Sequence, residues 1–238
     1  MSLEIQEAVT INEENLLIPN TKFSICYAYS DIGNEEANTC VKFCVASIKH
    51  TYSNVVNTYH IKYKTEKQFL LSTRTQLYMK MRNDIRGNLI FIDTDVIAYN
   101  AIPDDIWDMD FDIGLTPNEE NWPLMPFNSG VMFVKDTPEA AIYMKSVAHT
   151  ASNVPEGMHW ATKEIGDYSD WWIDQLSIAN NYYRLKDQIK FIFFNKELFN
   201  YIPEGPQATD AYFVHCKGSR KSLMKQYLCG ILGSDYVS

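Results

Sequence analysis

The chain has 238 residues and a formal net charge of −9, and hydrophobic residues make up 46% of it. A chain of this length can bury one sizeable core, so we expect a single domain over residues 1–238. The acidic balance, without a cluster of Lys and Arg, argues against a nucleic-acid-binding surface. No stretch approaches the about 18 uninterrupted apolar residues of a membrane span.

The start of the chain and its cysteines predict a cytoplasmic protein. Residues 1–20 lack the basic segment and the long apolar core of a secretory signal peptide. The five cysteines are an odd number without a Cys-x-x-Cys pair, which favours free thiols in a reducing compartment. Cys40, Cys44 and His50 could form part of a zinc site, but a fourth ligand is missing and the spacing also suits a buried helix face.

Strands and helices are predicted to alternate in the first part of the chain. Apolar or alternating runs predict strands over residues 22–30, 57–64 and 88–93, and helical periodicity predicts helices over 36–50 and 72–84. The helices are expected to turn the following side chains to the core: Val41, Cys44, Val45, Ile48, Leu77, Tyr78 and Met81. This alternation is typical of an α/β fold with a mainly parallel sheet.

After residue 100 the pattern indicates a mixed sheet. Two strands joined by the loop 119–126 should form a hairpin, and a later helix should bury one side. The further elements are strands over 111–118 and 127–136, a helix over 167–185, strands over 189–195 and 211–218, and a helix over 219–232. On the helix 167–185, Ser169 or Asp170 is the expected N-cap, and the buried side is expected to carry Trp172, Leu176, Ala179 and Tyr183.

Two aspartates, Asp93 and Asp95, follow the apolar run Leu89–Ile92 directly. In extended backbone, residues two apart point to the same side, so both carboxylates can converge beyond the strand end. Open α/β sheets bind ligands at the carboxyl ends of their strands. Paired carboxylates there suit a divalent cation that keeps places for water and phosphate oxygens. A capped strand end with solvated aspartates is the alternative.

Other acidic motifs compete with this pair. Asp108, Asp110 and Asp112 repeat the Asp-x-Asp pattern without a preceding apolar strand, and we interpret them as an exposed acidic edge. An apolar strand followed by Asp-x-Asp occurs in nucleotide-sugar glycosyltransferases and in haloacid-dehalogenase-type phosphatases. The phosphatase needs a later acidic motif, which Gly166–Asp170 superficially supplies, but no apolar strand precedes that motif. The phosphatase is therefore the weaker alternative.

Three later motifs complete an ordered set with the aspartate pair. They are Asn128-Ser129-Gly130 before a strand, Asp174-Gln175 on a helix, and His215, Gly218 and Lys221 in the pattern H-x-x-G-x-x-K. This set resembles the retaining glycosyltransferases of family 8, the group of glycogenin and bacterial galactosyltransferases. The resemblance covers about residues 89–221 and implies a GT-A fold, with a nucleotide-binding half (1–100) and a half for sugar and acceptor (101–238).

The resemblance implies a metal and diphosphate site. Asp93, Asp95 and His215 would bind Mn²⁺, or Mg²⁺, and an imidazole beside two carboxylates suits Mn²⁺. Gly218 would allow close approach of the backbone to the diphosphate, and Lys221 would place a positive charge on it. Outside the motif, such a histidine is more often buried for packing and such a lysine is solvated.

The resemblance also implies contacts to the donor sugar. Asn128, Ser129 and Gly130 would bind it, with Gly130 leaving room. Asp174 would bind sugar hydroxyls, and Gln175 would lie near the reacting anomeric carbon. Asn-Ser-Gly is otherwise good turn chemistry, and Asp174-Gln175 could be the solvated side of an amphipathic helix.

The nucleotide is expected over the end of the first strand. The candidates to stack on the base or read its edge are Tyr27, Ala28 and Tyr29. Core packing explains at least one of these tyrosines equally well. Arg74 could reach the phosphates or the sugar, and Arg82 and Arg86 are competing candidates. The diphosphate would lie beside Asp93 and Thr94.

The resemblance implies a metal-dependent hexosyltransferase. It would move a hexose from a nucleotide-diphosphate sugar, with UDP-glucose or UDP-galactose expected, to an unknown glycan, lipid or protein acceptor with retention. The amide of Gln175 argues against a double displacement like that of retaining hydrolases. The phosphatase and a non-catalytic nucleotide-sugar-binding protein are the alternatives, and a homodimer is compatible with the sequence.

Overall fold

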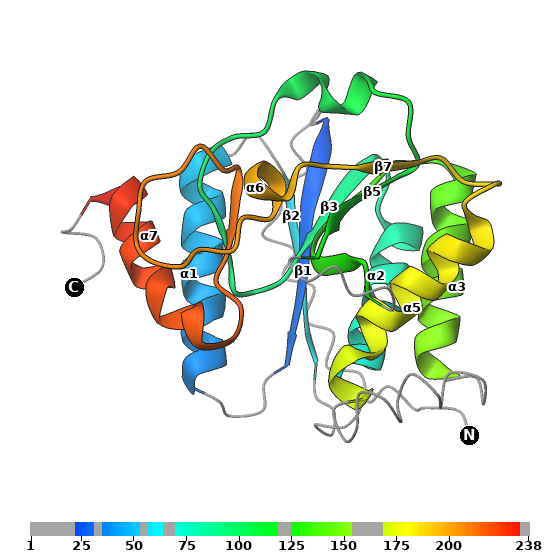
Figure 1. The fold of residues 1–238 in the computed structure, drawn as a ribbon, viewed down its shortest axis with the longest axis horizontal. Helices are drawn as coiled ribbons and strands as arrows, with labels where there is room; N and C mark the ends of the chain where they lie inside the picture. Colours follow the sequence, from blue (N-terminus) through cyan, green and yellow to red (C-terminus); the bar gives the residue numbers. More distant parts are fainter. Residues whose placement is uncertain are drawn as a thin grey trace.

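The computed structural model describes residues 22–30, 35–52, 57–63, 70–118, 125–153 and 169–233. A six-stranded sheet lies between two groups of helices, and a two-stranded sheet lies beside it (Figure 1). None of the helices described is long and apolar enough to cross a membrane. Residues 1–20, most of the loop 119–126 and the start of the Gly166–Asp170 motif lie outside the described part of the chain.

The six-stranded sheet has the order β2-β1-β3-β6-β5-β7. Its strands are β1 (Phe23–Ser30), β2 (Asn57–Tyr63), β3 (Asn88–Ile92), β5 (Ile113–Pro117), β6 (Phe127–Val134) and β7 (Phe191–Phe193). Only β6 runs against its neighbours β3 and β5, and the other pairs are parallel. The prediction of an α/β fold with a mixed, mainly parallel sheet and a β5–β6 hairpin is confirmed.

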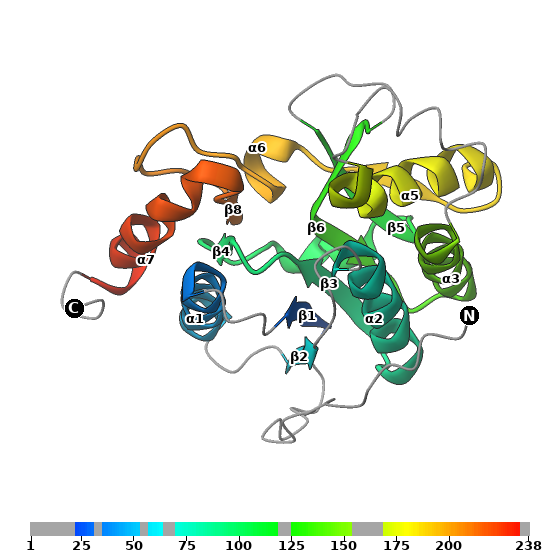
Figure 2. The same cartoon turned by 90° about the horizontal axis from the view of Figure 1, so that it is seen from below.

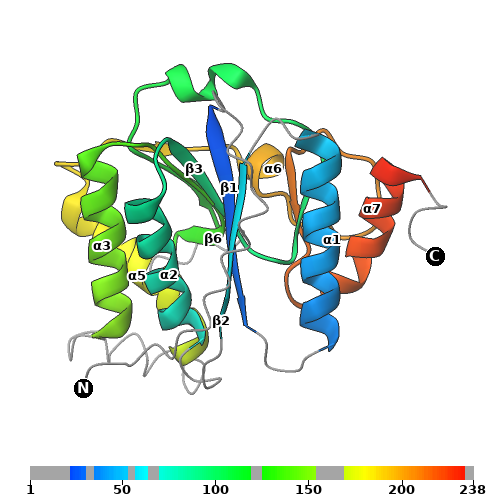
Figure 3. The same ribbon diagram turned by 180° about the vertical axis from the view of Figure 1, so that it is seen from behind.

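Helices cover both faces of this sheet. One face is covered by α1 (Glu35–Tyr52), and the other by α2 (Leu70–Asp84), α3 (Pro138–Ser152) and α5 (Ser169–Leu185) (Figures 2 and 3). The helix α7 (Met224–Leu232) packs against α1. Three short helices complete the description: η2 (Asp104–Asp108), α6 (Lys196–Phe199) and η5 (Gly218–Leu223).

The small sheet joins two segments that are far apart in sequence. Its strands β4 (Val96–Ala98) and β8 (Phe213–His215) are antiparallel, and Val96 lies opposite His215. Its outer side packs on α1 and α7 through a cluster that includes Cys40, Cys216 and Tyr227. This sheet therefore ties the end of the chain to the residues that follow β3.

The helix α3 was not predicted from sequence, nor were β4 and α6. Signals for α3 are present, since Thr137 caps it by accepting from the Ala140 N–H at 3.2 Å and Pro138 opens it. Its buried side follows helical spacing through Ala140, Tyr143, Met144 and Val147. The prediction that Tyr183 lies on the buried side of α5 is wrong, because that side chain is 52% exposed.

The two faces of the sheet have separate cores. On the α1 side, Cys44 and Ile48 pack with the rings of Phe133, Phe194 and Phe213. On the other side, Leu77, Tyr78 and Met81 of α2 pack with α3 and α5, as the periodicity of α2 predicts. The fully buried ring of Phe133 lies near the centre of the first core, with its centroid 4.8 Å from that of Phe194 and 5.6 Å from that of Phe199.

We expect Phe133→Ala to lower the free energy of unfolding by about 3–5 kcal/mol, because it leaves a cavity among fixed rings. Denaturant unfolding followed by circular dichroism measures this loss. The control is Ile142→Ala on α3, where the side chain is 56% exposed, and its effect should stay within about 0.5 kcal/mol. Equal losses in both variants would contradict this assignment of the core.

Candidate metal and sugar-nucleotide site

Polar residues from several elements converge at one edge of the main sheet, where the parallel strands β1 and β3 end. Because β6 runs antiparallel to β3, its first residues lie at this same edge. The backbone shows the contact directly, since the Asp93 N–H donates to the Gly130 carbonyl at 2.9 Å. The asparagine-serine-glycine segment is thereby placed next to the aspartate pair.

Asp93, Asp95 and His215 form a cluster in which one ligand atom from each residue lies within 4.8 Å of the others. His215 Nε2 is 3.3 Å from Asp95 Oδ1 and 3.9 Å from Asp93 Oδ2. We expected the aspartates to converge through extended backbone, and this expectation is wrong. They lie in a turn between β3 and β4, in which the Val96 N–H donates to the Asp93 carbonyl at 3.2 Å.

The donor atoms of this cluster fit a divalent cation. Two carboxylates and one imidazole are ligands that Mn²⁺ accepts, and carboxylates also suit Mg²⁺. The small sheet supplies the third ligand, because pairing of Val96 with His215 brings β8 beside the aspartate turn. The Asp95 carbonyl accepts from the Cys216 N–H at 2.9 Å and extends this pairing.

The two aspartates are electrostatically unequal. Burial raises the pKa of Asp93 to about 6, although Arg74 opposes this shift. Burial acts on Asp95 too, but the charge and hydrogen bond of His215 and the charge of Lys221 outweigh it, so the pKa of Asp95 lies below its usual range. A cation would favour the ionised form of Asp93, because carboxylates bind metals deprotonated.

Arg74 joins the aspartate pair to α5. Its Nη1 donates to Asp93 Oδ1 at 2.6 Å, and its Nη2 donates to Ser129 Oγ at 3.3 Å and to Asp174 Oδ2. Ser129 Oγ also donates to Asp174 Oδ2 at 2.8 Å. Arg74 thus lies in the site, whereas Arg82 pairs with Asp136 at 3.0 Å, away from the cluster.

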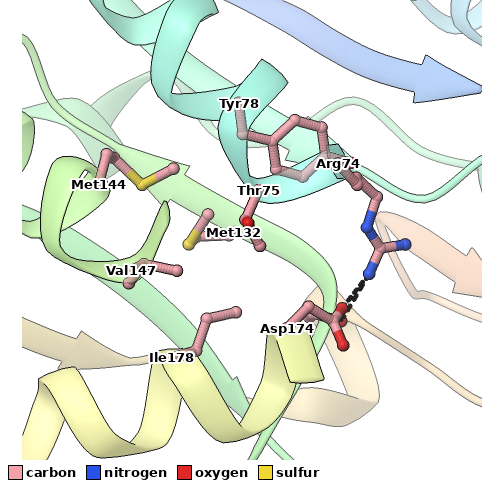
Figure 4. A pocket seen from close by; sticks show the side chains of 9 residues that line it. Arg74, Thr75, Tyr78, Met132, Met144, Val147, Asp174 and Ile178 are labelled. Carbon is pink, nitrogen blue, oxygen red and sulfur yellow. Dashed lines mark hydrogen bonds and ion pairs between the residues drawn. The ribbon is translucent and has the colours of Figure 1, made fainter. Parts of the chain in front are cut away.

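The Arg74–Asp174 pair stands at one end of a small pocket between α2, α3, α5 and β6 (Figure 4). Beyond the pair, the apolar walls of this pocket come from Met132, Met144, Val147 and Ile178. The ion pair therefore borders a region of low polarity, in which its attraction is screened less than in water.

The next residue on α5, Gln175, is buried, and its Oε1 has no hydrogen-bond partner among the described residues. Buried amide oxygens are usually paired, so such an atom is uncommon in a folded chain. Its position beside Asp174 agrees with the expected place of Gln175 near a ligand, which stays a prediction.

A buried polar network lies behind His215. Its Nδ1 is 3.0 Å from Asn200 Oδ1, and Asn200 Nδ2 donates to Thr116 Oγ1 at 2.8 Å and to Asn128 Oδ1 at 2.9 Å. Asn200 and Thr116 were not predicted from the sequence, because an asparagine after a short helix and a threonine in a strand carry no local sign of such a role. Only the fold brings them to the histidine.

Gly130 is required by close packing. A Cβ at this position would lie 2.3 Å from Cε1 and Nδ1 of His215 and 2.8 Å from Asn128 Oδ1. The space beside Gly130 is thus filled by the histidine ring. The proposed room for a donor sugar at Gly130 stays a prediction.

The residues expected to contact the nucleotide lie at the end of β1. Tyr27 and Ala28 are buried, Tyr29 is partly buried, and the rings of the two tyrosines stack with centroids 6.3 Å apart. Thr94, in the turn between the aspartates, is partly buried. These positions suit the expected nucleotide site, and the contacts themselves stay predictions.

The closing motif lies on η5. Gly218 has a φ of 63°, in the left-handed region that favours glycine. Lys221 Nζ is 3.5 Å from Glu36 Oε2 on α1, and its charge also acts on Asp95. Lys221 is thereby close enough to the aspartate pair to influence it, and its contact with a diphosphate stays a prediction.

Among the described residues, the other acidic motif and the cysteines form no further group that could hold a metal. Asp108 and Asp110 are exposed as expected, but Asp112 is buried and accepts from Thr137 Oγ1 at 2.8 Å and from the Lys190 N–H at 2.9 Å. All five cysteines are free thiols.

Comparison with known proteins shows the fold. No family model and no curated protein sequence matches the chain. A glycosyltransferase involved in glycosylation of the major capsid of PBCV-1 is 17% identical with a TM-score of 0.57, over 86% of this chain and 98% of that chain. The galactosyltransferase LgtC, solved with donor and acceptor sugar analogues, is 14% identical with a TM-score of 0.51, over 88% and 96%.

A third similar structure is the bifunctional glycosyltransferase WbbM, 8% identical with a TM-score of 0.56, over 92% of this chain and 52% of that chain. The shared architecture is the GT-A fold of glycosyltransferases, as the resemblance implied. The similarity at these identities concerns the fold, and membership of family 8 stays a prediction.

We expect Gly130→Ala to weaken Mn²⁺ binding by about 10-fold or more, because the new methyl group displaces the ring of His215. Isothermal titration calorimetry measures the affinity. The control is Gly205→Ala, where a Cβ would meet nothing within 4 Å. Wild-type affinity in Gly130→Ala would show that the packing of this ring does not matter for the metal.

Proposed function

We propose that the protein is a divalent-metal-dependent glycosyltransferase that transfers a hexose from a UDP-hexose to a glycan, lipid or protein acceptor, with retention of configuration. The observation that carries the proposal is the cluster of Asp93, Asp95 and His215 at the carboxyl edge of a GT-A sheet. The fold supports the proposal by analogy, and the cluster supports it by its chemistry.

The cluster would hold Mn²⁺, or Mg²⁺, through one atom of each residue. When bound, the cation would neutralise the diphosphate and the charge that develops on the leaving UDP. Lys221 would add a second positive charge from η5, leaving its contact with Glu36, which is an exposed and therefore weak ion pair. Such fixed charges favour the transition state more strongly where water is excluded.

Donor-sugar binding would fall to residues on β6 and α5. Asp174 would accept hydrogen bonds from sugar hydroxyls, and Arg74 and Ser129 hold its carboxylate in place. Asn128 Oδ1 is already used by Gly130 N–H and Asn200, so a sugar contact of Asn128 would use its Nδ2. The tyrosines at the end of β1 would contact the base.

Gln175 would act at the reaction centre. Its unpaired Oε1 could face the positive charge that develops on the sugar when the bond to the diphosphate breaks. An amide is a weak nucleophile, so its proposed role is electrostatic stabilisation of that charge.

The alternatives differ in their chemistry. A haloacid-dehalogenase-type phosphatase is not favoured, because the fold is that of glycosyltransferases. A non-catalytic protein of the same fold would bind UDP and Mn²⁺ without cleaving a UDP-hexose. The two experiments that follow separate these cases.

We expect wild-type protein to bind UDP in the presence of Mn²⁺, and Asp95→Asn to weaken this binding by about 100-fold, because a neutral amide is a poor metal ligand. Calorimetry with and without Mn²⁺ measures the effect. Asp110→Asn is the matched control, since Asp110 belongs to the exposed Asp-x-Asp pattern and pairs only with exposed Lys190 among the described residues. Absence of UDP binding in the wild type would refute the proposal.

A screen of UDP-hexoses should find one that the protein hydrolyses or transfers. Gln175→Ala should lower the rate of donor cleavage by about 100-fold while UDP binding stays unchanged, and Gln188→Ala, at an exposed turn, should have no effect. Donor cleavage is followed by released UDP. Binding of UDP without cleavage of any UDP-hexose would favour the non-catalytic alternative.

A further inference from the structure

The buried network behind His215 determines which of its ring nitrogens carries a proton. The first fixed point is the Gly130 N–H, which as a backbone group can only donate, and it meets the side chain of Asn128 at 2.8 Å. The atom that receives this bond must be the carbonyl oxygen of Asn128. The orientation of the Asn128 amide follows from chemistry, although nitrogen and oxygen of an amide look alike.

The same reasoning orients Asn200. Asn128 Oδ1 also meets the Asn200 amide at 2.9 Å, and an oxygen there requires the NH₂ group of Asn200 as donor. That NH₂ group lies 2.8 Å from Thr116 Oγ1, which accepts its second hydrogen. The Asn200 atom that faces His215 is therefore its carbonyl oxygen.

A carbonyl oxygen can only accept, so the proton of this contact belongs to His215 Nδ1, 3.0 Å away. In a neutral imidazole with a proton on Nδ1, the lone pair is on Nε2. This is the nitrogen that lies 3.3 Å from Asp95 and 3.9 Å from Asp93. The hydrogen bond of His215 to Asp95 in the metal-free protein uses a proton on Nε2. A metal would take the place of that proton while Nδ1 keeps its own, whereas a ring whose last proton is on Nε2 could not bind a metal there.

Burial disfavours any other orientation of the two amides. Thr116, Asn128, Asn200 and His215 have exposed fractions of 0%, 4%, 2% and 3%. A flip of either amide would bring like groups together and leave buried donors and acceptors unpaired, each at a cost of about 1–3 kcal/mol. Solvent has little access to compensate for such a change.

We propose that Asn200 is a positioning residue that, oriented by Asn128 and Thr116, holds His215 in the tautomer whose Nε2 can bind the metal. This inference rests on the proposed metal site and deepens it. Second-shell partners of this kind orient metal-binding histidines and raise their basicity. The backbone N–H of Gly130 fixes the orientation of the Asn128 amide and thereby that of Asn200. The absence of a Cβ at Gly130 also leaves space for the histidine ring.

The first test measures Mn²⁺ affinity by calorimetry in full-length variants. Asn200→Leu removes the acceptor at similar volume and should weaken binding by about 10–100-fold. Asn200→Asp keeps an acceptor oxygen for Nδ1 but loses the donor to Asn128 Oδ1, so it should bind Mn²⁺ more weakly than the wild type and more tightly than Asn200→Leu. Asn181→Leu is the matched control, because Asn181 is also fully buried and donates to a threonine hydroxyl, Thr150 Oγ1, at 2.9 Å.

Two results of this comparison would overturn the inference. One is wild-type Mn²⁺ affinity in Asn200→Leu. The other is an equal loss in Asn181→Leu, which would assign the effect to general destabilisation. If Asn200→Leu does not fold, Asn200→Ala replaces it, and Mn²⁺ binding in Asn200→Asp no tighter than in Asn200→Ala would count against the inference.

The second test needs neither metal nor activity. Nitrogen-15 NMR of metal-free protein distinguishes protonated from unprotonated ring nitrogens, and a His215→Gln spectrum assigns the signals among the five histidines. At a pH high enough for the ring to carry a single proton, we expect that proton on His215 Nδ1 in the wild type and in Asn200→Asp, and on Nε2 in Asn200→Leu. An unprotonated Nδ1 in the wild type refutes the inference. Failure of the wild type to bind Mn²⁺ would instead refute the proposed function.

Discussion

The site depends on an imbalance of charge. Three carboxylates, those of Asp93, Asp95 and Asp174, lie around one guanidinium and one imidazole. Carboxylates that leave water are costly unless they are paired, and Arg74 contacts two of them while His215 contacts Asp95 most closely. This pairing depends on the placement of two helices, because α2 carries the guanidinium of Arg74 and α5 carries Asp174 to the same edge of the sheet. What stays uncompensated is negative, and a cation is the partner that such a cluster favours.

Three Asp-x-Asp patterns in one chain show how surroundings decide the role of an aspartate. Asp112 is as buried as a site residue, but its oxygens accept from a threonine hydroxyl and from a backbone N–H, so its acceptors are used within the fold. Asp110 contacts an exposed lysine, which water and salt screen. Asp93 and Asp95 instead lie beside His215, with which they could hold a metal ion. The three patterns have the same sequence form, but their carboxylate oxygens differ in the groups that they face.

Much of the architecture could be predicted from local pattern. The continuous apolar run before Asp93 marks a central strand, and the spacing of Leu77, Tyr78 and Met81 marks the buried side of α2. The cluster of Asp93, Asp95 and His215 could be predicted from ordered motifs, although the route was wrong, since a turn and not an extended strand brings the carboxylates together. The helix α3 was not predicted, although its threonine cap and the helical spacing of its buried residues are local signals for it.

Asn200 could not be predicted by such means. It follows a helix of four residues, and its contacts reach β5, β6 and β8, which are separated from it by 15 to 84 positions. Local propensity holds no information about which side chains meet across such distances. Buried amides are found only when the tertiary structure shows which donors and acceptors must be satisfied.

The short pairing of β4 with β8 sets the position of His215 relative to the aspartates. Its three residue pairs fix the register of β8 against β4, which directly follows the aspartate turn. Side chains alternate along a strand, so a slip of one position would place Val214 or Cys216 opposite Val96 and turn the imidazole to the other side. The length of the segment between the strands has little influence on this register, since longer loops add only slowly to the entropy of closure. Insertions in the loop around residues 204–208 should therefore leave the aspartate–histidine spacing intact, whereas a single residue added within 96–98 or 213–215 would shift it.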